Sequence, residues 1–248
     1  KSWNIVKKLP YNKKYKYLKD EYVSKLKAVP DKYRDVLNYY IKKCDQITKK
    51  IKIFSRYKWN FIMSINGLEL NMPFTINKEI ILPQSLLESV YKDFKNNDKN
   101  SSFKQQFINT LIHEKIHIIQ RFNQNKFNKF YLNEYKLFLT KRFNEKDIPD
   151  NIARANMNNP DSNNEYWIYK DNDDTYLPLL IYNNNKIDNY GYFFKSKKLK
   201  KINYHRIKLG FKKDVSFYHP NEIFACELSR QLVNNNVKYT YLNFLNKF

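Results

Sequence analysis

Glycine, cysteine and long apolar runs are scarce in this chain of 248 residues, which has three Gly and two Cys. So few glycines leave no Gly-rich loop of the kind that binds phosphate through backbone amides. The two cysteines, Cys44 and Cys226, provide no disulfide framework, which fits a reducing compartment. No apolar run is long enough to span a membrane, and no internal repeat is present. Phosphate-loop enzymes, disulfide scaffolds and membrane-spanning helices are therefore poor interpretations.

Acidic residues are also few, because 24 Asp and Glu face 46 Lys and Arg and give a net charge of +22. Residues 1–60 hold 18 basic against 5 acidic side chains, and residues 186–213 hold 10 against 1. Only 7 of the 46 basic residues are Arg, the usual base-reading residue. Two interpretations stay open: a basic surface that contacts nucleic acid phosphates or an acidic partner nonspecifically, and a lysine excess that follows from an AT-rich genome.

The most informative motif is His113-Glu114-x-x-His117, which lies in an apolar, helix-compatible run from Thr110 to Gln120. Histidines four apart on a helix lie about 40° apart around its axis and one turn apart, so both imidazoles can reach one metal ion. Glu114 then lies beside that metal, where it can take a proton from a bound water. The chain has only four His, and two of them fall in this arrangement, which argues against coincidence.

The motif and its flanks resemble the extended signature of the zincin metallopeptidases. Thr110 stands three residues before the first His, where that family commonly has Thr or Val, and the apolar Ile118 and Ile119 follow the second. The resemblance implies a Zn²⁺ ion held by His113 and His117, with Glu114 as the catalytic base. Lys115 is a departure, because the family usually has an uncharged residue there, although a lysine at that position can point to solvent.

A catalytic zinc takes three protein ligands and leaves a fourth position for water. The run Asn221-Glu222-x-Phe224-Ala225 resembles the second helix of the gluzincins, most closely the Asn-Glu-x-Phe-Ala run of aminopeptidase N-type enzymes. By that resemblance Glu222 is the third ligand, and His219 is the competing candidate. Pro220 suits the first position of a helix that is expected to run to about Leu232.

Two further features depart from the family pattern. His117 and Glu222 are 105 positions apart (222 minus 117), so the segment between them is expected to be a large insertion or a subdomain. Cys226 stands four residues after Glu222, where thermolysin-like enzymes have an Asp that orients the first His. Glu227 follows it and is the candidate for that orienting role. The resemblance therefore rests on two short motifs.

The mechanism that the resemblance implies is hydrolysis of peptide bonds by a zinc-dependent endopeptidase. Zinc held by His113, His117 and Glu222 lowers the pKa of a bound water, and Glu114 passes its proton to the leaving amine. The developing oxyanion needs a second electrophile, which in related enzymes is a Tyr or His from later in the chain. Tyr218 and His205 are assigned to this role, and Tyr239 and Tyr241 stay as alternatives.

The segment before the motif predicts a small sheet. A strand over 59–65, a turn at Asn66-Gly67 and a strand over 68–70 indicate a hairpin, and residues 74–82 indicate a second strand pair. A helix is expected over 84–94, before the motif helix. Strands followed by this helix are the zincin order, which implies that an extended substrate binds by strand addition.

The expected fold class is α+β and zincin-like, with a small mixed sheet before the HExxH helix and a mostly helical second half that carries a β-containing insertion. Two helices divided at Pro30-Asp31 are predicted over 14–50, and one over 127–143. Strands are predicted over 166–169, over 176–182, where Pro178 favours a sheet edge, and in 190–211. The expected domains are a basic helical segment, 1–50, and a metallopeptidase domain, 51–248, with an insertion at about 145–215.

The sequence thus predicts a zinc metalloendopeptidase that acts on a peptide or protein substrate. The alternative is a basic structural or nucleic-acid-associated, virion-type protein on a zincin-derived scaffold with little or no catalysis. A third hypothesis is a zinc-stabilised binding domain, marked by a closed site with four ligands, for example with both His219 and Glu222 bound. The composition resembles proteins of large DNA viruses or other AT-rich genomes, and an intracellular (cytoplasmic) or virion location is favoured.

Overall fold

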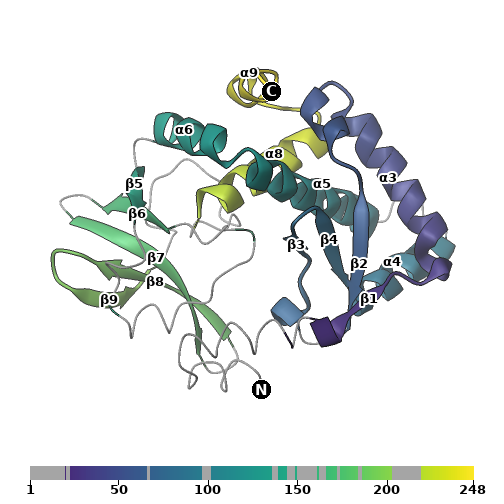
Figure 1. Ribbon diagram of the computed structural model, residues 1–248, viewed down its shortest axis with the longest axis horizontal. Coiled ribbons are helices and arrows are strands. Elements are labelled where there is room, and N and C mark those ends of the chain that lie inside the picture. The colour runs from purple at the N-terminus through teal and green to yellow at the C-terminus, as the bar shows by residue number, and fades with distance from the viewer. Residues whose placement is uncertain are drawn as a thin grey trace. The chain divides into compact units, whose positions relative to one another are not determined.

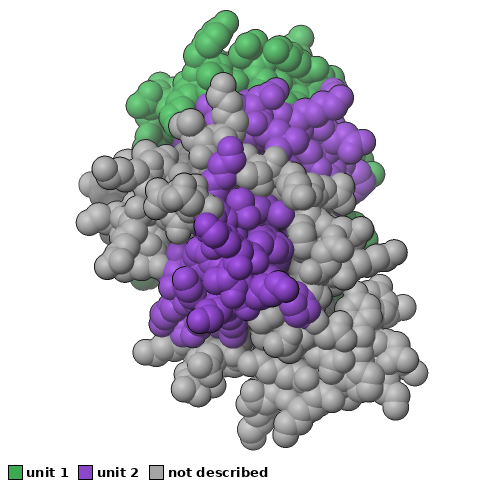
Figure 2. Space-filling view, turned by 90° about the vertical axis from the view of Figure 1, so that its left-hand side faces the viewer, with its two compact units in different colours: residues 1–119, 228–248 green, residues 120–227 purple. Residues whose placement is uncertain are grey.

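The computed structural model describes residues 20, 23–65, 68–96, 102–135, 139–143, 149, 161, 166–171, 174–183, 186–202 and 219–248. These residues form a mixed α and β fold with two small sheets, which confirms the α+β class. The chain divides into two compact units, residues 1–119 with 228–248 and residues 120–227 (Figure 2). The division falls within helices α5 (Ser102–Phe122) and α8 (Pro220–Val233), so each of these helices contributes to both units.

The first unit contains a four-stranded sheet in the order β1-β2-β4-β3 (Figure 1). Its strands are β1 (Leu26–Ala28), β2 (Asn60–Ser64), β3 (Phe74–Ile76) and β4 (Glu79–Pro83). The pair β2–β4 is parallel, whereas β1–β2 and β3–β4 are antiparallel, so the sheet is mixed, as predicted. Asn77 closes the β3–β4 hairpin at a φ of 51°, a conformation that Asn tolerates in turns.

Two predictions in this unit are wrong. Residues 68–71 form a 3₁₀ helix, η3 (Leu68–Asn71), and the sheet neighbours of β2 are β1 and β4. The expected partner strand over 68–70 is therefore absent, while the Asn66-Gly67 turn itself lies outside the described residues. Residues 26–28 form strand β1 where a helix before Pro30 was expected. At residues 26–28 the long-range pairing of β1 with β2 overrides the local pattern.

The first unit also contains several helices. They are η1 (Asp31–Tyr33), α3 (Arg34–Thr48), η2 (Lys52–Arg56), α4 (Gln84–Lys95), as predicted for 84–94, and α9 (Tyr239–Leu245). The ring of Tyr40 on α3 meets Phe107 of α5 edge-on, with centroids 4.9 Å apart, and Tyr39 meets Phe94 of α4 at 5.4 Å. Helix α3 therefore holds α5 on one side and α4 on another.

The second unit combines helix α6 (Gln124–Glu134) with an antiparallel sheet in the order β5-β6-β7-β8-β9. Its strands are β5 (Leu139–Phe143), β6 (Tyr166–Asp171), β7 (Asp174–Asn183), β8 (Lys186–Phe193) and β9 (Lys198–Lys201). The strands expected over 166–169 and 176–182 are confirmed. The helix expected to reach residue 143 ends at Glu134 instead, and 139–143 become strand because β5 pairs with β6.

Pro178 lies within an internal strand, contrary to the prediction of a sheet edge. The register of β7 with β6 runs over residues 174–176, whereas Pro178 pairs with Gly191 of β8. Pro178 thus lies beyond the residues of β7 that pair with β6, which suits a residue without an amide proton.

The domain boundaries predicted at residues 50 and 51 stay a prediction, and the pairing of β1 with β2 crosses them. Among the described residues, no helix combines the length and apolar character needed to cross a membrane.

Candidate metal centre

Helix α5 carries both histidines of the motif. From Leu111 to Gln120 every side chain except that of His113 is buried, as expected for a helix in a core. The Nε2 atoms of His113 and His117 lie 2.9 Å apart, and the ring planes are inclined by 83°. Two nitrogens bound tetrahedrally to one zinc ion are about 3.3 Å apart. The two ring nitrogens are therefore close enough to bind one ion and lie within hydrogen-bond distance of each other.

Helix α8 supplies Glu222. The helix begins at Pro220, at the position that the sequence predicted, and Glu222 lies in its first turn with 6% of its surface exposed. The amide groups at a helix N-terminus stabilise a carboxylate there. Glu222 belongs to two groups of ligand atoms that lie within 4.8 Å of one another, one with His113 and Cys226 and one with His117 and Asp161. Each pair among the three predicted ligands is thus within reach of one ion.

His219, the competing third ligand, is held in another role. Its Nδ1 accepts a hydrogen bond of 3.1 Å from the backbone N–H of Asn221. A neutral imidazole that accepts at Nδ1 carries its proton on Nε2, so neither nitrogen offers a lone pair to a metal. His219 acts instead as a cap on the first turn of α8, and the geometry favours Glu222 as the ligand.

A buried hydrogen-bond network centred on Asn221 fixes the start of α8. Its backbone C=O accepts from Gln120 Nε2 at 3.0 Å, and its side-chain Oδ1 accepts from the Tyr131 hydroxyl at 3.0 Å. Its Nδ2 donates to the carbonyl of Asp161 at 2.9 Å. With the bond to His219, all four polar groups of Asn221 are engaged. Gln120 lies one turn after His117 on the same side of α5, and Asn221 adjoins Glu222 on α8. The network therefore joins the two helices close to His117 and Glu222.

Aromatic packing supports the same turn of α8. The ring of Phe224 lies edge-on to Phe127 and Phe130, with centroids 5.2 and 5.6 Å apart. Ala225 is fully buried, so its small side chain suits close packing. In the run that suggested Glu222 as a ligand, Asn221, Phe224 and Ala225 thus have positioning roles that the structure makes explicit.

Asp161 and Cys226 are two further candidate ligands near the centre that the sequence did not lead us to propose. Asp161 is 4% exposed, and the Arg121 guanidinium lies 3.4 Å from its carboxylate. No local pattern marks this residue. The sequence marks Cys226 only as the replacement of an orienting Asp. Its spacing of four from Glu222 places both on one face of a helix, which was the available signal.

The charge of the centre suits a cation. Glu114, Asp161 and Glu222 are all at most 6% exposed. Buried carboxylates need compensation by hydrogen bonds, opposite charge or a metal ion. Arg121 provides one positive charge beside Asp161. Two histidines and several carboxylates form a donor set typical of zinc, and its chemistry fits the ion that the resemblance implies.

Lys115 does not point to solvent, because it is only 1% exposed. Its Nζ lies 3.8 Å from the centroid of the Trp59 ring, and the Trp59 indole N–H donates to Asp45 at 2.8 Å. Burial lowers the pKa of Lys115 to about 8, although the nearby Asp45 carboxylate opposes that shift. The positive end of this side chain thus lies against Trp59.

The residues assigned to the oxyanion, His205 and Tyr218, lie outside the described residues and stay predictions. Of the two alternatives, Tyr239 is 79% exposed and Tyr241 is 1% exposed. Comparison of the chain with protein-family models, curated proteins and solved structures finds no match.

Proposed function

We propose that this protein is a zinc-dependent metalloendopeptidase of the gluzincin type. The observation that carries the proposal is that donor atoms of His113, His117 and Glu222, from two helices, lie pairwise within reach of a metal ion. His113 and His117 bring their Nε2 atoms within 2.9 Å of each other, and the Glu222 carboxylate from α8 comes within 4.8 Å of a donor atom of each histidine. Three protein ligands of this kind, with room for water, are typical of catalytic zinc.

The catalytic role proposed for Glu114 follows from its place beside His113. When bound, zinc supplies Lewis acidity toward a substrate carbonyl and lowers the pKa of a coordinated water. Glu114 accepts a proton from the attacking water and then delivers it to the leaving amine. The low exposure of Glu114, 4%, strengthens its electrostatic interactions in the site because little water screens them.

The substrate proposed is an extended peptide. The mixed sheet precedes α5 in the chain, and β3 and β1 are its two edge strands. An edge strand offers backbone N–H and C=O groups to which an extended chain can add. Binding of this kind reads the backbone of a peptide, which suits an endopeptidase.

The test of the proposal is the metal content of purified protein, measured by mass spectrometry for wild type, Glu222→Ala and His219→Ala. We expect about one zinc per wild-type chain, little or none in Glu222→Ala, and wild-type content in His219→Ala, which serves as the matched control. Zinc that is retained in Glu222→Ala but lost in His219→Ala would show that His219, and not Glu222, is the third ligand. No zinc in wild type after reconstitution would defeat the peptidase proposal.

One observation favours the alternative, a nucleic-acid-associated role. Residues 195–201, at the end of the second sheet, are all exposed and contain five lysines. They are Lys195, Lys197, Lys198, Lys200 and Lys201. Lys201 pairs with Asp188 at 2.6 Å. We call residues 195–201 the basic edge, and its chemistry suits phosphate contacts without base specificity.

A further inference from the structure

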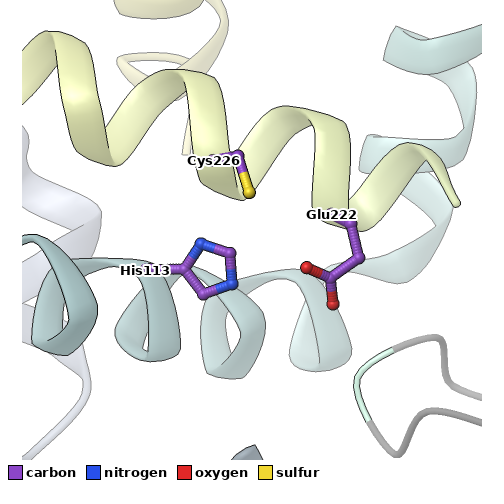
Figure 3. Close-up of side chains that lie close together, drawn as sticks. All are labelled: His113, Glu222 and Cys226. Carbon is purple, nitrogen blue, oxygen red and sulfur yellow. The ribbon is translucent and has the colours of Figure 1, made fainter. Parts of the chain in front are cut away.

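Cys226 lies with the metal ligands and has no role in the mechanism above. It stands one helical turn after Glu222 on α8, and Figure 3 shows both side chains projecting from α8 toward His113 of α5. Donor atoms of Cys226, His113 and Glu222 all lie within 4.8 Å of one another. The other cysteine, Cys44, is fully buried, whereas Cys226 is half-buried.

As a further zinc ligand, the thiolate of Cys226 is a stronger candidate than the carboxylate of Asp161. Zinc binds thiolate sulfur at about 2.3 Å, and soft thiolate ligands select for zinc. Asp161 offers a harder oxygen, and Arg121 already lies 3.4 Å from it. Cys226 shares a group of donor atoms with His113 and Glu222, and His117 lies beside His113 with their Nε2 atoms 2.9 Å apart. Four such protein ligands on one ion would match the closed arrangement of zinc sites that lack an open position for water.

We propose that Cys226 is a fourth, displaceable zinc ligand that closes the site at rest. This inference rests on the proposed zinc site and describes its regulation. A cysteine side chain has one rotatable bond with three staggered positions, so its sulfur can leave the ion without movement of the helix. Cys226 is half-buried, and we expect a small thiol reagent to reach its sulfur. Departure of the sulfur opens the position at which water binds.

The decisive experiment replaces zinc by cobalt(II) in the whole protein and records the near-ultraviolet absorption. A thiolate ligand gives a sulfur-to-cobalt charge-transfer band, which we expect in wild type and in a Glu114→Gln control, but not in Cys226→Ala. Stoichiometric cobalt binding without this band in wild type would overturn the role of Cys226 and leave the proposed zinc site intact. Failure of wild type and Cys226→Ala alike to bind cobalt would defeat the zinc site as well.

Thiol reactivity and turnover supply independent readouts. We expect zinc to slow alkylation of Cys226 by iodoacetamide at least tenfold, with buried Cys44 as the internal reference in the same mass spectra. At saturating zinc, we expect Cys226→Ala and the near-isosteric Cys226→Ser to hydrolyse a peptide library several-fold faster than wild type. Equal alkylation rates with and without zinc, or no gain in hydrolysis in both variants, would contradict a displaceable ligand.

Discussion

Helices α5 and α8 hold their metal-binding side chains in different ways. On α5 the histidines are placed by helical spacing, within a stretch that is buried among apolar neighbours. On α8 Glu222 is placed by a network in which every polar group of Asn221 is engaged. Tyr131, whose hydroxyl donates to Asn221, is 90 positions away from it in the chain. Ligands placed by helical period can be recognised in a sequence, whereas ligands placed by a network depend on distant residues.

The largest expected effect concerns Glu114 and tests whether α5 supplies the catalytic base as well as two metal ligands. Glu114→Gln keeps the size of the side chain and removes its basicity, so zinc should be retained while peptide hydrolysis falls by roughly 10²- to 10⁴-fold. Hydrolysis of a peptide library and metal content are measured on the same preparation. Wild-type hydrolysis in zinc-loaded Glu114→Gln would remove Glu114 from the mechanism.

The second effect concerns Lys115, the charged residue buried on the same helix. Its pKa is lowered to about 8 in the folded chain, against about 10.4 for an unperturbed lysine. Between these values the unfolded state binds more protons, so the free energy of unfolding should rise with pH. The destabilisation is fully present below pH 8 and is lost as the pH approaches 10.4. Its size is on the order of 3 kcal/mol.

Lys115→Met isolates the contribution of the buried charge to stability, because Met fills the same space with an uncharged side chain of similar length. We expect the variant to be more stable than wild type near pH 7 in urea denaturation, with an advantage that shrinks as the pH rises through this window. Lys129→Met, at an exposed position of α6, is the control and should change stability by less than about 0.5 kcal/mol. A difference that does not vary with pH would show that Lys115 titrates alike in both states.

How far the site could be predicted follows from the same comparison. The period and apolar flanks of α5 indicated His113 and His117, and Pro220 with the Asn-Glu-x-Phe-Ala run indicated α8. Asp161 lies in a polar stretch without periodicity, so only the fold shows that it is buried near the ligands. The burial of Lys115 was also missed, because its partner Trp59 comes from a segment 56 positions earlier (115 minus 59).

For the fold as well, elements with local sequence signals were predicted correctly, and elements that depend on distant residues were not. Helices α4 and α8 begin at residues 84 and 220, where the sequence placed them, because helix-start signals are local. Residues 26–28, 68–71 and 139–143 were assigned wrongly. The first and third are strands whose partners are more than 20 positions away, so their state is decided by pairing and not by their own residues.

The third effect tests the network on α8. Asn221→Leu keeps the volume and removes both side-chain hydrogen bonds, leaving buried groups of Tyr131 and Asp161 without these partners at about 1–3 kcal/mol each. Glu222 should then be less well oriented, and we expect zinc affinity to fall by roughly 10- to 100-fold. Zinc titration with a competing chelator measures the affinity.

Tyr131→Phe is the matched control, because it keeps the ring that packs against Phe224 and removes only the hydroxyl. We expect it to cost about 1 kcal/mol of stability and to weaken zinc less than Asn221→Leu does. If Asn221→Leu binds zinc as wild type does, α8 does not depend on the network, and Glu222 is placed by helical period as the histidines of α5 are.

The smallest effect contrasts the metal centre with the basic edge. Lys198→Gln combined with Lys200→Gln removes two exposed charges from β9 and none from α5 or α8. If the basic edge binds phosphates, the slope of log affinity for duplex DNA against log salt should become shallower by about 0.9 for each phosphate that is no longer neutralised. Zinc content should stay unchanged. The measurement is fluorescence anisotropy of labelled DNA across a salt series, with Lys129→Gln as the control. An unchanged slope would exclude the basic edge from nucleic acid binding and leave the centre on α5 and α8 as the functional site.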